Sequence, residues 1–110
     1  MRDGIIILDT IAGKELGFTS DKFLCGSYLW KRGEYIYISF IHSREQRKGY
    51  LSALFDTILK GYGIKVPNPS VLMEAILIKK GFERTEEPSE SIELSKYHEF
   101  VEVWVKEKNK

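Results

Sequence analysis

Apolar residues occur along this chain in short runs whose spacing changes from one segment to the next. Residues 35–41, YIYISFI, are mainly aromatic or β-branched and contain no turn-forming residue, so we expect a strand that is buried on both faces. Residues 51–59 instead place leucine, phenylalanine and isoleucine at helical spacing, which predicts a helix over residues 49–60 with one apolar face. A buried strand that leads into an amphipathic helix is therefore the clearest unit in the sequence.

A second strand completes this unit. Gly61 and Gly63 end the helix, and residues 64–66 form a short β-rich run that Pro67 ends. Because a helix connects the two strands, we expect them to be parallel, with a right-handed crossover. Residues 23–30 and 35–42 flank a short polar connection with Gly33, which predicts an antiparallel hairpin before the helix.

The remaining segments extend the predicted sheet. Residues 4–9 are β-branched and predict an edge or second strand, followed by a loop or bend that Gly13 and Gly17 mark. Asn68 as N-cap and Pro69 as first helical residue predict a second helix that runs to residue 79 and is capped by Gly81. Residues 82–85 and 100–106 predict two closing strands around a loop at residues 86–96. The expected fold is α/β (α+β), with a mixed sheet in a single domain over residues 1–110.

Composition limits the classes of function. The 17 basic and 16 acidic residues give a net charge of +1, which indicates neither a nucleic-acid nor a membrane partner. One cysteine, Cys25, excludes an intramolecular disulfide and a Cys-x-x-Cys site, and we interpret it as a small buried residue, with Gly26 at a bulge or close contact. The longest apolar run, residues 5–8, is too short for a signal peptide or a membrane span, so a cytoplasmic location is expected. We find no metal-binding motif.

The connection between the central strand and its helix predicts an anion site. Residues 43–49 are polar, include Arg44, Arg47 and Lys48, and end in Gly49. Unpaired N–H groups and the positive end of the helix dipole meet at such a point, which favours a phosphorylated ligand. For each basic side chain a role as part of a solvated loop beside Glu45 is an equal alternative.

The same residues resemble a known family. Residues 46–51, QRKGYL, resemble the Gln/Arg-x-x-Gly-x-Gly/Ala signature of the GCN5-related N-acetyltransferase (GNAT) family, in which backbone amides hold the pyrophosphate of acetyl-coenzyme A. In that family the signature also follows a long strand and opens an amphipathic helix. The resemblance covers about residues 18–106. This sequence departs from the pattern at Leu51, where the family has a small residue, and it lacks most of the helical region that precedes the hairpin in the family.

The resemblance implies an acyl-CoA N-acyltransferase-like fold, acetyl-CoA as cofactor and an amine of a small molecule or protein as acceptor. The residues that it assigns to coenzyme binding are Ser39, Phe40, Ile41, His42, Gln46, Arg47, Lys48, Gly49, Tyr50, Leu51 and Ser52. The acceptor is not identified by the sequence, and a homodimer is left open.

The residues for proton transfer do not carry over from the family. Its second helix often has an asparagine and a tyrosine that protonates the leaving thiolate, and here those positions are Ser70 and Leu77. His42 and Tyr97 are the catalytic candidates, with His98 beside Tyr97, although a structural role at the strand end is favoured for His42 and a loop or strand-edge role for Tyr97 and His98. Two other functions therefore stay open: a degenerate GNAT-fold module that binds coenzyme A or a protein without turnover, and a purely structural or partner-binding α/β domain.

Overall fold

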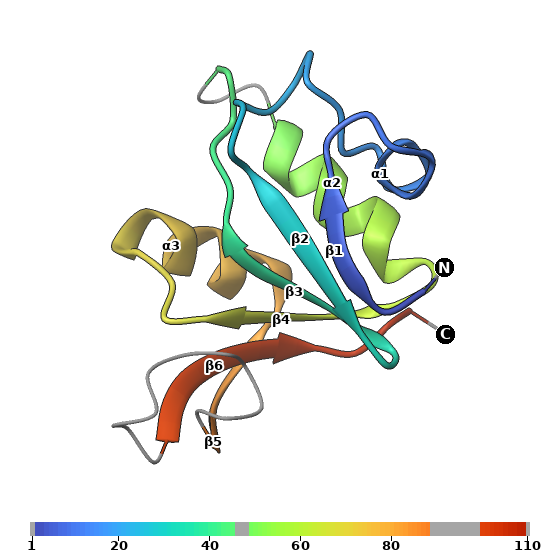
Figure 1. The fold of residues 1–110 in the computed structure, drawn as a ribbon. Coiled ribbons are helices and arrows are strands. Elements are labelled where there is room, and N and C mark those ends of the chain that lie inside the picture. The colour runs from blue at the N-terminus through green and yellow to red at the C-terminus, as the bar shows by residue number, and fades with distance from the viewer. Residues whose placement is uncertain (1, 46–48, 89–99, 110) are drawn as a thin grey trace.

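The computed structural model describes residues 2–45, 49–88 and 100–109, and these form one six-stranded sheet and three helices (Figure 1). The strands are β1 (Gly4–Ile7), β2 (Tyr28–Arg32), β3 (Tyr35–Phe40), β4 (Gly63–Pro67), β5 (Glu83–Pro88) and β6 (Phe100–Lys106). The helices are α1 (Ile11–Leu16), α2 (Tyr50–Leu59) and α3 (Val71–Lys80). No helix among the described residues is long and apolar enough to cross a membrane.

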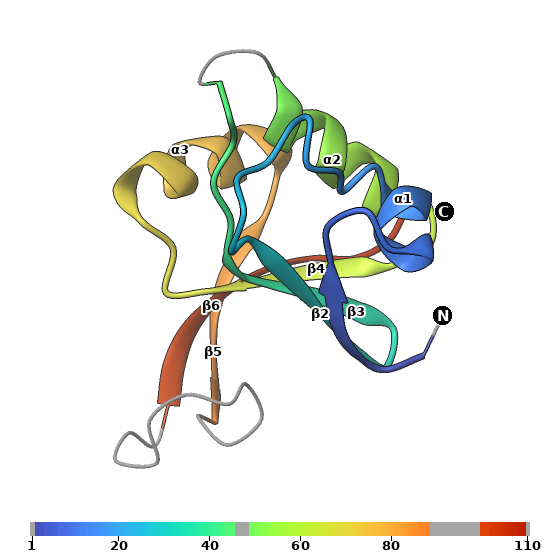
Figure 2. The ribbon, with the colours of Figure 1, turned by 45° about the horizontal axis from the view of Figure 1, so that its top comes forward.

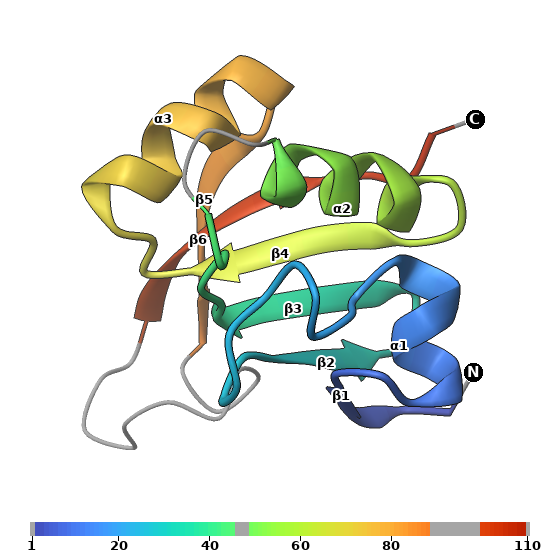
Figure 3. The ribbon, with the colours of Figure 1, turned by 90° about the horizontal axis from the view of Figure 1, so that it is seen from above.

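The sheet is mixed, with strand order β1-β2-β3-β4-β6-β5. Adjacent strands are antiparallel throughout, except β3 and β4, which are parallel and connected through α2. Figure 3 shows β1 to β4 side by side in this order. The predicted hairpin, the parallel strand–helix–strand unit, the edge position of the first strand and the two closing strands are confirmed, and with them the mixed α/β class.

The three described helices lie on the same side of the sheet (Figure 2). Alternate residues of the central strands, including Ile36, Ile38, Ile64 and Val66, point into one core that also contains Leu77 of α3. That core also receives the predicted apolar face of α2: Leu54, Phe55, Ile58 and Leu59. The helical spacing of α2 and the strand alternation of β3 therefore meet in one hydrophobic layer, as expected for an amphipathic helix packed on a sheet.

The prediction of a loop after the first strand is wrong. The segment forms α1, because the Thr10 hydroxyl accepts a hydrogen bond from the Gly13 N–H at 3.1 Å and Gly17, with φ of 78°, closes the helix. Gly13 is inside this helix. A larger residue does not fit there, because a Cβ would lie 2.6 Å from the Ile7 carbonyl oxygen. The two glycines thus allow a close helix–strand contact and a helix end.

The predicted start of the second helix is also wrong. The N-cap of α3 is Ser70, whose side chain accepts a hydrogen bond from the Met73 N–H at 3.2 Å. Asn68 lies two residues earlier with φ of 43°, and its N–H donates to the Glu102 carbonyl at 2.9 Å. Its backbone extends the contact between β4 and β6 and does not enter a helix. The C-terminal prediction is confirmed, since Gly81 closes α3 with φ of 84°.

The expected burial of Cys25 is contradicted, because the side chain is exposed. The first strand of the hairpin begins only at Tyr28, and Cys25 and Gly26 lie in a turn before it, with Gly26 at φ of 95°. The closing strand β5 continues through residues 86–88, which we had expected to begin the loop.

Candidate functional site

The parallel strands β3 and β4 pair over only part of their length. Their register runs from Tyr35–Gly63 to Tyr37–Lys65. Beyond it, in the described chain, β3 pairs with β2 through Phe40, and β4 pairs with β6. Figure 1 shows the chain leaving β3 toward α2 and leaving β4 toward α3. We call this point, formed by residues 38–42 and 66–67, the β3–β4 fork.

An irregularity in β3 lies at the fork. Trp30 pairs with Tyr37 and Tyr28 pairs with Phe40, so β3 has one residue more than β2 over this stretch. Bulges of this kind bend a strand, end regular pairing and are frequent beside active sites. After Ile38, which is buried, Ser39 and Phe40 are exposed. The prediction that this strand is buried on both faces therefore holds up to the bulge and fails after it.

The chain after β3 is fixed on one side. The His42 carbonyl accepts a hydrogen bond from the Leu24 N–H at 2.8 Å, and the His42 N–H donates to the Ser27 hydroxyl at 2.9 Å. The His42 ring is exposed and packs edge-on against Phe40, with 4.8 Å between ring centroids. The backbone of His42 is therefore directed toward the 24–27 turn, while its imidazole remains accessible.

The N-terminus of α2 lies next along the chain. Gly49 is its N-cap, with φ of 75°, and no side chain caps the helix there. The first turn of α2 contains no acidic residue. Gln46, Arg47 and Lys48 lie outside the described residues, whereas Gly49, Tyr50, Leu51 and Ser52 open the helix. The described part of the predicted anion site thus has a helix start without a capping side chain, where N–H groups can receive an anion.

A cluster of charged and phenolic groups lies where the parallel pairing ends. Lys65 forms a 2.7 Å salt bridge to Glu87 of β5, and its Nζ lies 4.3 Å from the centroid of the Tyr35 ring and 5.7 Å from that of Tyr37. Partial burial lowers the pKa of Lys65, but the hydrogen bond to Glu87 and the contact with Tyr37 outweigh it, so the net pKa is raised. Burial raises the pKa of Tyr37, and the charge of Lys65 opposes that rise. At neutral pH the cluster holds an ammonium group and a protonated phenol.

The α3 positions that would supply catalytic groups in the family are structural here. Leu77 is fully buried in the core, and the Ser70 hydroxyl caps the helix. Tyr97 and His98 lie outside the described residues. Among the described residues no group of three histidine, cysteine or acidic side chains gathers as metal ligands would.

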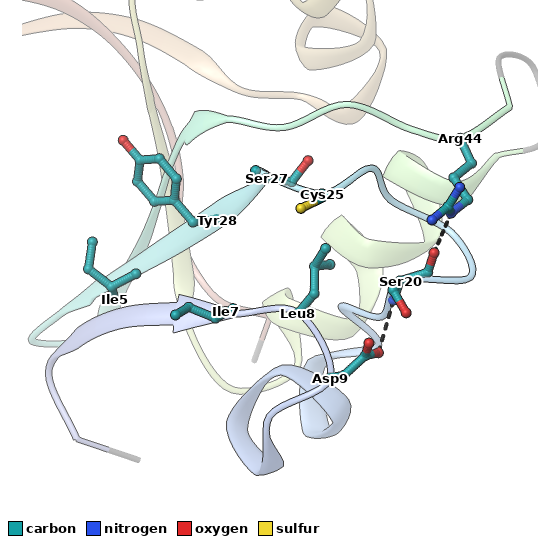
Figure 4. Close-up of a pocket in the computed structure, with 10 residues that line it drawn as sticks. Ile5, Ile7, Leu8, Asp9, Ser20, Cys25, Ser27, Tyr28 and Arg44 are labelled. Atoms are coloured by element: carbon teal, nitrogen blue, oxygen red, sulfur yellow. Dashed lines mark hydrogen bonds between the residues drawn. The ribbon is translucent and has the colours of Figure 1, made fainter.

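A second feature is an open pocket of about 480 Å³ beside β1 (Figure 4). We call it the β1 pocket. Its wall contains Ile5, Ile7 and Tyr28, and the turn with Cys25 and Gly26 contributes to it. Its polar part is a chain of hydrogen bonds in which Asp9 accepts from the Ser20 N–H at 2.9 Å and the Arg44 Nε donates to the Ser20 carbonyl. The pocket adjoins the fork, because Ser27, which also lines it, holds the His42 N–H.

Comparison with known proteins gives no relative: no family model, curated protein or solved structure matches this chain.

The structure brings together several residues that the sequence did not single out as functional. Lys65, Tyr37 and Glu87 come from three strands, and Asp9 and Ser20 from two connections. Arg44, which the sequence assigned to the anion site, donates instead to the Ser20 carbonyl and lines the β1 pocket. The alternation in residues 35–38 separates Tyr35 and Tyr37 from Ile36 and Ile38, so it could have placed both phenols opposite the helices. Neither Lys65 nor Asp9 lies in a recognisable motif.

Proposed function

We propose that this chain is an acetyl-CoA-dependent N-acyltransferase that acts at the β3–β4 fork. The observation that carries the proposal is the coincidence of two features. Parallel pairing stops after Tyr37–Lys65, and α2, the next helix along the chain, has Gly49 as an N-cap with a left-handed backbone and no capping side chain. An extended acyl-carrying arm needs an unpaired strand edge, and its phosphates need N–H groups at the end of that edge.

The backbone of residues 39–41 suits the first requirement. Because His42 directs its N–H and carbonyl groups toward Ser27 and Leu24, we expect Ile41, the preceding residue in an extended chain, to direct its own toward β4. Amide groups of a pantetheine arm would then pair with this edge in the manner of an added strand.

Transfer forms a C–N bond between a neutral amine and the thioester carbonyl and breaks the C–S bond, so the leaving thiolate needs a proton. Leu77 is apolar and buried, and it cannot donate one. Tyr37 is a protonated phenol at the last pair before the fork, and His42, the last residue of the fork on the β3 side, has an exposed imidazole. We assign Tyr37 as the candidate proton donor and His42 as the candidate base for the incoming amine.

The burial of Leu77 favours one other function. A chain that replaces the family's proton donor with a core residue is also suited to bind coenzyme A, or a protein, without turnover. The two functions share the fork and differ only in the release of free thiol.

The test is calorimetric titration of the protein with acetyl-CoA, comparing Gly49→Ala with Gly61→Ala. A Cβ at either glycine meets nothing within 4 Å, but only Gly49 has a positive φ. A left-handed backbone costs a residue with a Cβ about 1–2 kcal/mol, and an alanine at position 49 can relieve this cost in the free protein by leaving that conformation. Binding of the phosphates would have to restore it, so Gly49→Ala should weaken binding about ten-fold, whereas Gly61→Ala should leave it unchanged. Absence of binding at millimolar acetyl-CoA would reject both the enzyme and the coenzyme-binding module.

A further inference from the structure

The β1 pocket combines an apolar wall with two opposite charges. Ile5 and Ile7 are 56% and 57% exposed, although both are large aliphatic side chains on a strand. In the register of β1 with β2, Ile7 lies opposite Tyr28, and Figure 4 shows Ile7 and Tyr28 on the same side of the pocket. This wall offers an apolar ligand group a surface that the described residues leave open to solvent.

The charged groups of the pocket, Asp9 and Arg44, are exposed side chains that are both hydrogen-bonded to Ser20. Asp9 binds the N–H of Ser20 and Arg44 binds the carbonyl of the same residue, so the carboxylate and the guanidinium lie on either side of one residue. The backbone of Arg44 is also held, because its backbone N–H donates to the Lys22 carbonyl at 2.8 Å. A carboxylate and a guanidinium that are hydrogen-bonded to the same residue offer complementary charges to a ligand that carries an ammonium and a carboxylate on one carbon atom.

We propose that the β1 pocket binds a free α-amino acid with an apolar side chain, with its ammonium on Asp9, its carboxylate on Arg44 and its side chain against Ile5, Ile7 and Tyr28. A neutral apolar ligand would form no ion pair in the pocket, and a ligand with a single charge would pair with only one of the two groups.

This site goes beyond the acyltransferase proposed above and does not depend on it. The hydrogen bonds from Ser20 lower the pKa of Asp9, so its carboxylate is ionised at neutral pH. An ammonium paired with that carboxylate keeps its proton and is a poor nucleophile. The amino acid is therefore a bound ligand of a second site and not an amine in position for transfer at the fork.

The experiment is a titration of the isotope-labelled protein, without coenzyme, followed by NMR chemical shifts. L-Leucine should give saturable shifts at residues of the pocket, with a Kd of about 0.1–1 mM, as expected for a small ligand with few non-hydrogen atoms. Isoamylamine lacks the carboxylate of leucine, isocaproate lacks the ammonium, and glycine lacks the side chain. Each should bind several-fold more weakly than leucine.

Two variants test the assigned charges. Asp9→Asn tolerates the φ of 65° at this position and can still accept the Ser20 N–H, so it removes only the charge. Asp9→Asn and Arg44→Gln should each weaken leucine binding about three- to ten-fold, since solvent screens partly exposed pairs. Glu15→Gln and Lys60→Gln, which remove exposed charges outside the pocket, should have no effect.

Two results would overturn the proposal. One is the absence of saturable shifts with leucine. The other is an affinity that neither Asp9→Asn nor Arg44→Gln changes, or that isocaproate and isoamylamine match. Because no arm contains acetyl-CoA, failure here is separate from failure of the acyltransferase proposal.

Discussion

The buried hydroxyl of Ser27 accepts the backbone N–H of His42 at 2.9 Å, and this bond ties the end of β3 to the turn before β2. Ser27 is 3% exposed, so its hydroxyl has little access to water. The same residue lines the β1 pocket. One hydrogen bond thus joins the fork and the β1 pocket.

Ser27→Ala should lower the free energy of unfolding by about 1–3 kcal/mol, because the His42 N–H loses its partner in a partly buried place. It should also speed hydrogen exchange at the His42 amide. Chemical denaturation and exchange measured by NMR give the two results. Ser43→Ala, a change in the same short segment, is the control. An exchange rate at His42 unaltered by Ser27→Ala would show that this bond does not hold the fork.

The Lys65–Glu87 pair should be sensitive to the loss of one partner. Both side chains are 17% exposed, so Glu87→Gln leaves the Lys65 ammonium with little solvent to replace the carboxylate. Breaking such a pair costs more than replacing both partners, and we expect Glu87→Gln to destabilise the fold by about 1–3 kcal/mol and the double variant Lys65→Met/Glu87→Gln by less.

The matched control is the Lys80–Asp56 pair, at the same 2.7 Å but with Asp56 62% exposed. Asp56→Asn should change stability by less than about 1 kcal/mol in urea denaturation. Equal effects at the two pairs would mean that burial does not govern either of them.

The raised pKa of Tyr35 predicts that the protein loses folding stability at alkaline pH. Its hydroxyl donates to the Glu107 carboxylate at 2.6 Å, and that bond, with burial and nearby carboxylates, raises the pKa of Tyr35 to about 12. A pKa raised on folding contributes stability that is complete below the unfolded pKa of about 10 and is lost as the pH rises through the folded value. Tyrosinate absorbance should show one phenol titrating near 12 in the native protein. Glu107→Gln should lower the pKa of Tyr35 toward its ordinary value. An unchanged titration would contradict the role of the Glu107 hydrogen bond.

The sequence predicted the parts of the fold whose signals are local. Residues 35–38 and 51–59 have the periodicity of a strand and a helix, and both elements formed as expected. The sequence did not predict helix α1, because a glycine such as Gly13 usually indicates a loop. Here the glycine is needed for close packing against the Ile7 carbonyl, which only the folded structure shows. The N-cap of α3 was misplaced for a related reason, since the backbone of Asn68 is committed to Glu102 on a distant strand.

The candidate site was less predictable. Gly49 and the helix start could be identified from the sequence, but the end of pairing after Tyr37–Lys65 depends on a bulge set by the register with β2. The cluster around Lys65 and the polar part of the β1 pocket join residues from distant segments, and no linear spacing signals either group. Strand register and contacts between segments that are far apart in the sequence create both groups.

The last prediction concerns turnover, measured as free thiol released from acetyl-CoA with a panel of amines. If Tyr37 donates the proton to the thiolate, Tyr37→Phe should lower kcat about 10²- to 10⁴-fold while the affinity for acetyl-CoA stays the same. His42→Ala should shift the pH profile toward alkaline values, where the amine loses its proton without help. Tyr97→Phe tests the other candidate from the sequence. Leu77→Tyr, which would introduce the tyrosine of the family that the sequence resembles, should instead destabilise the protein, because a phenol does not fit a fully buried leucine site and its hydroxyl finds no water there. Turnover that Tyr37→Phe, His42→Ala and Tyr97→Phe all leave intact would reject these assignments. Tight binding of acetyl-CoA with no thiol release for any amine would favour the coenzyme-binding module over the enzyme.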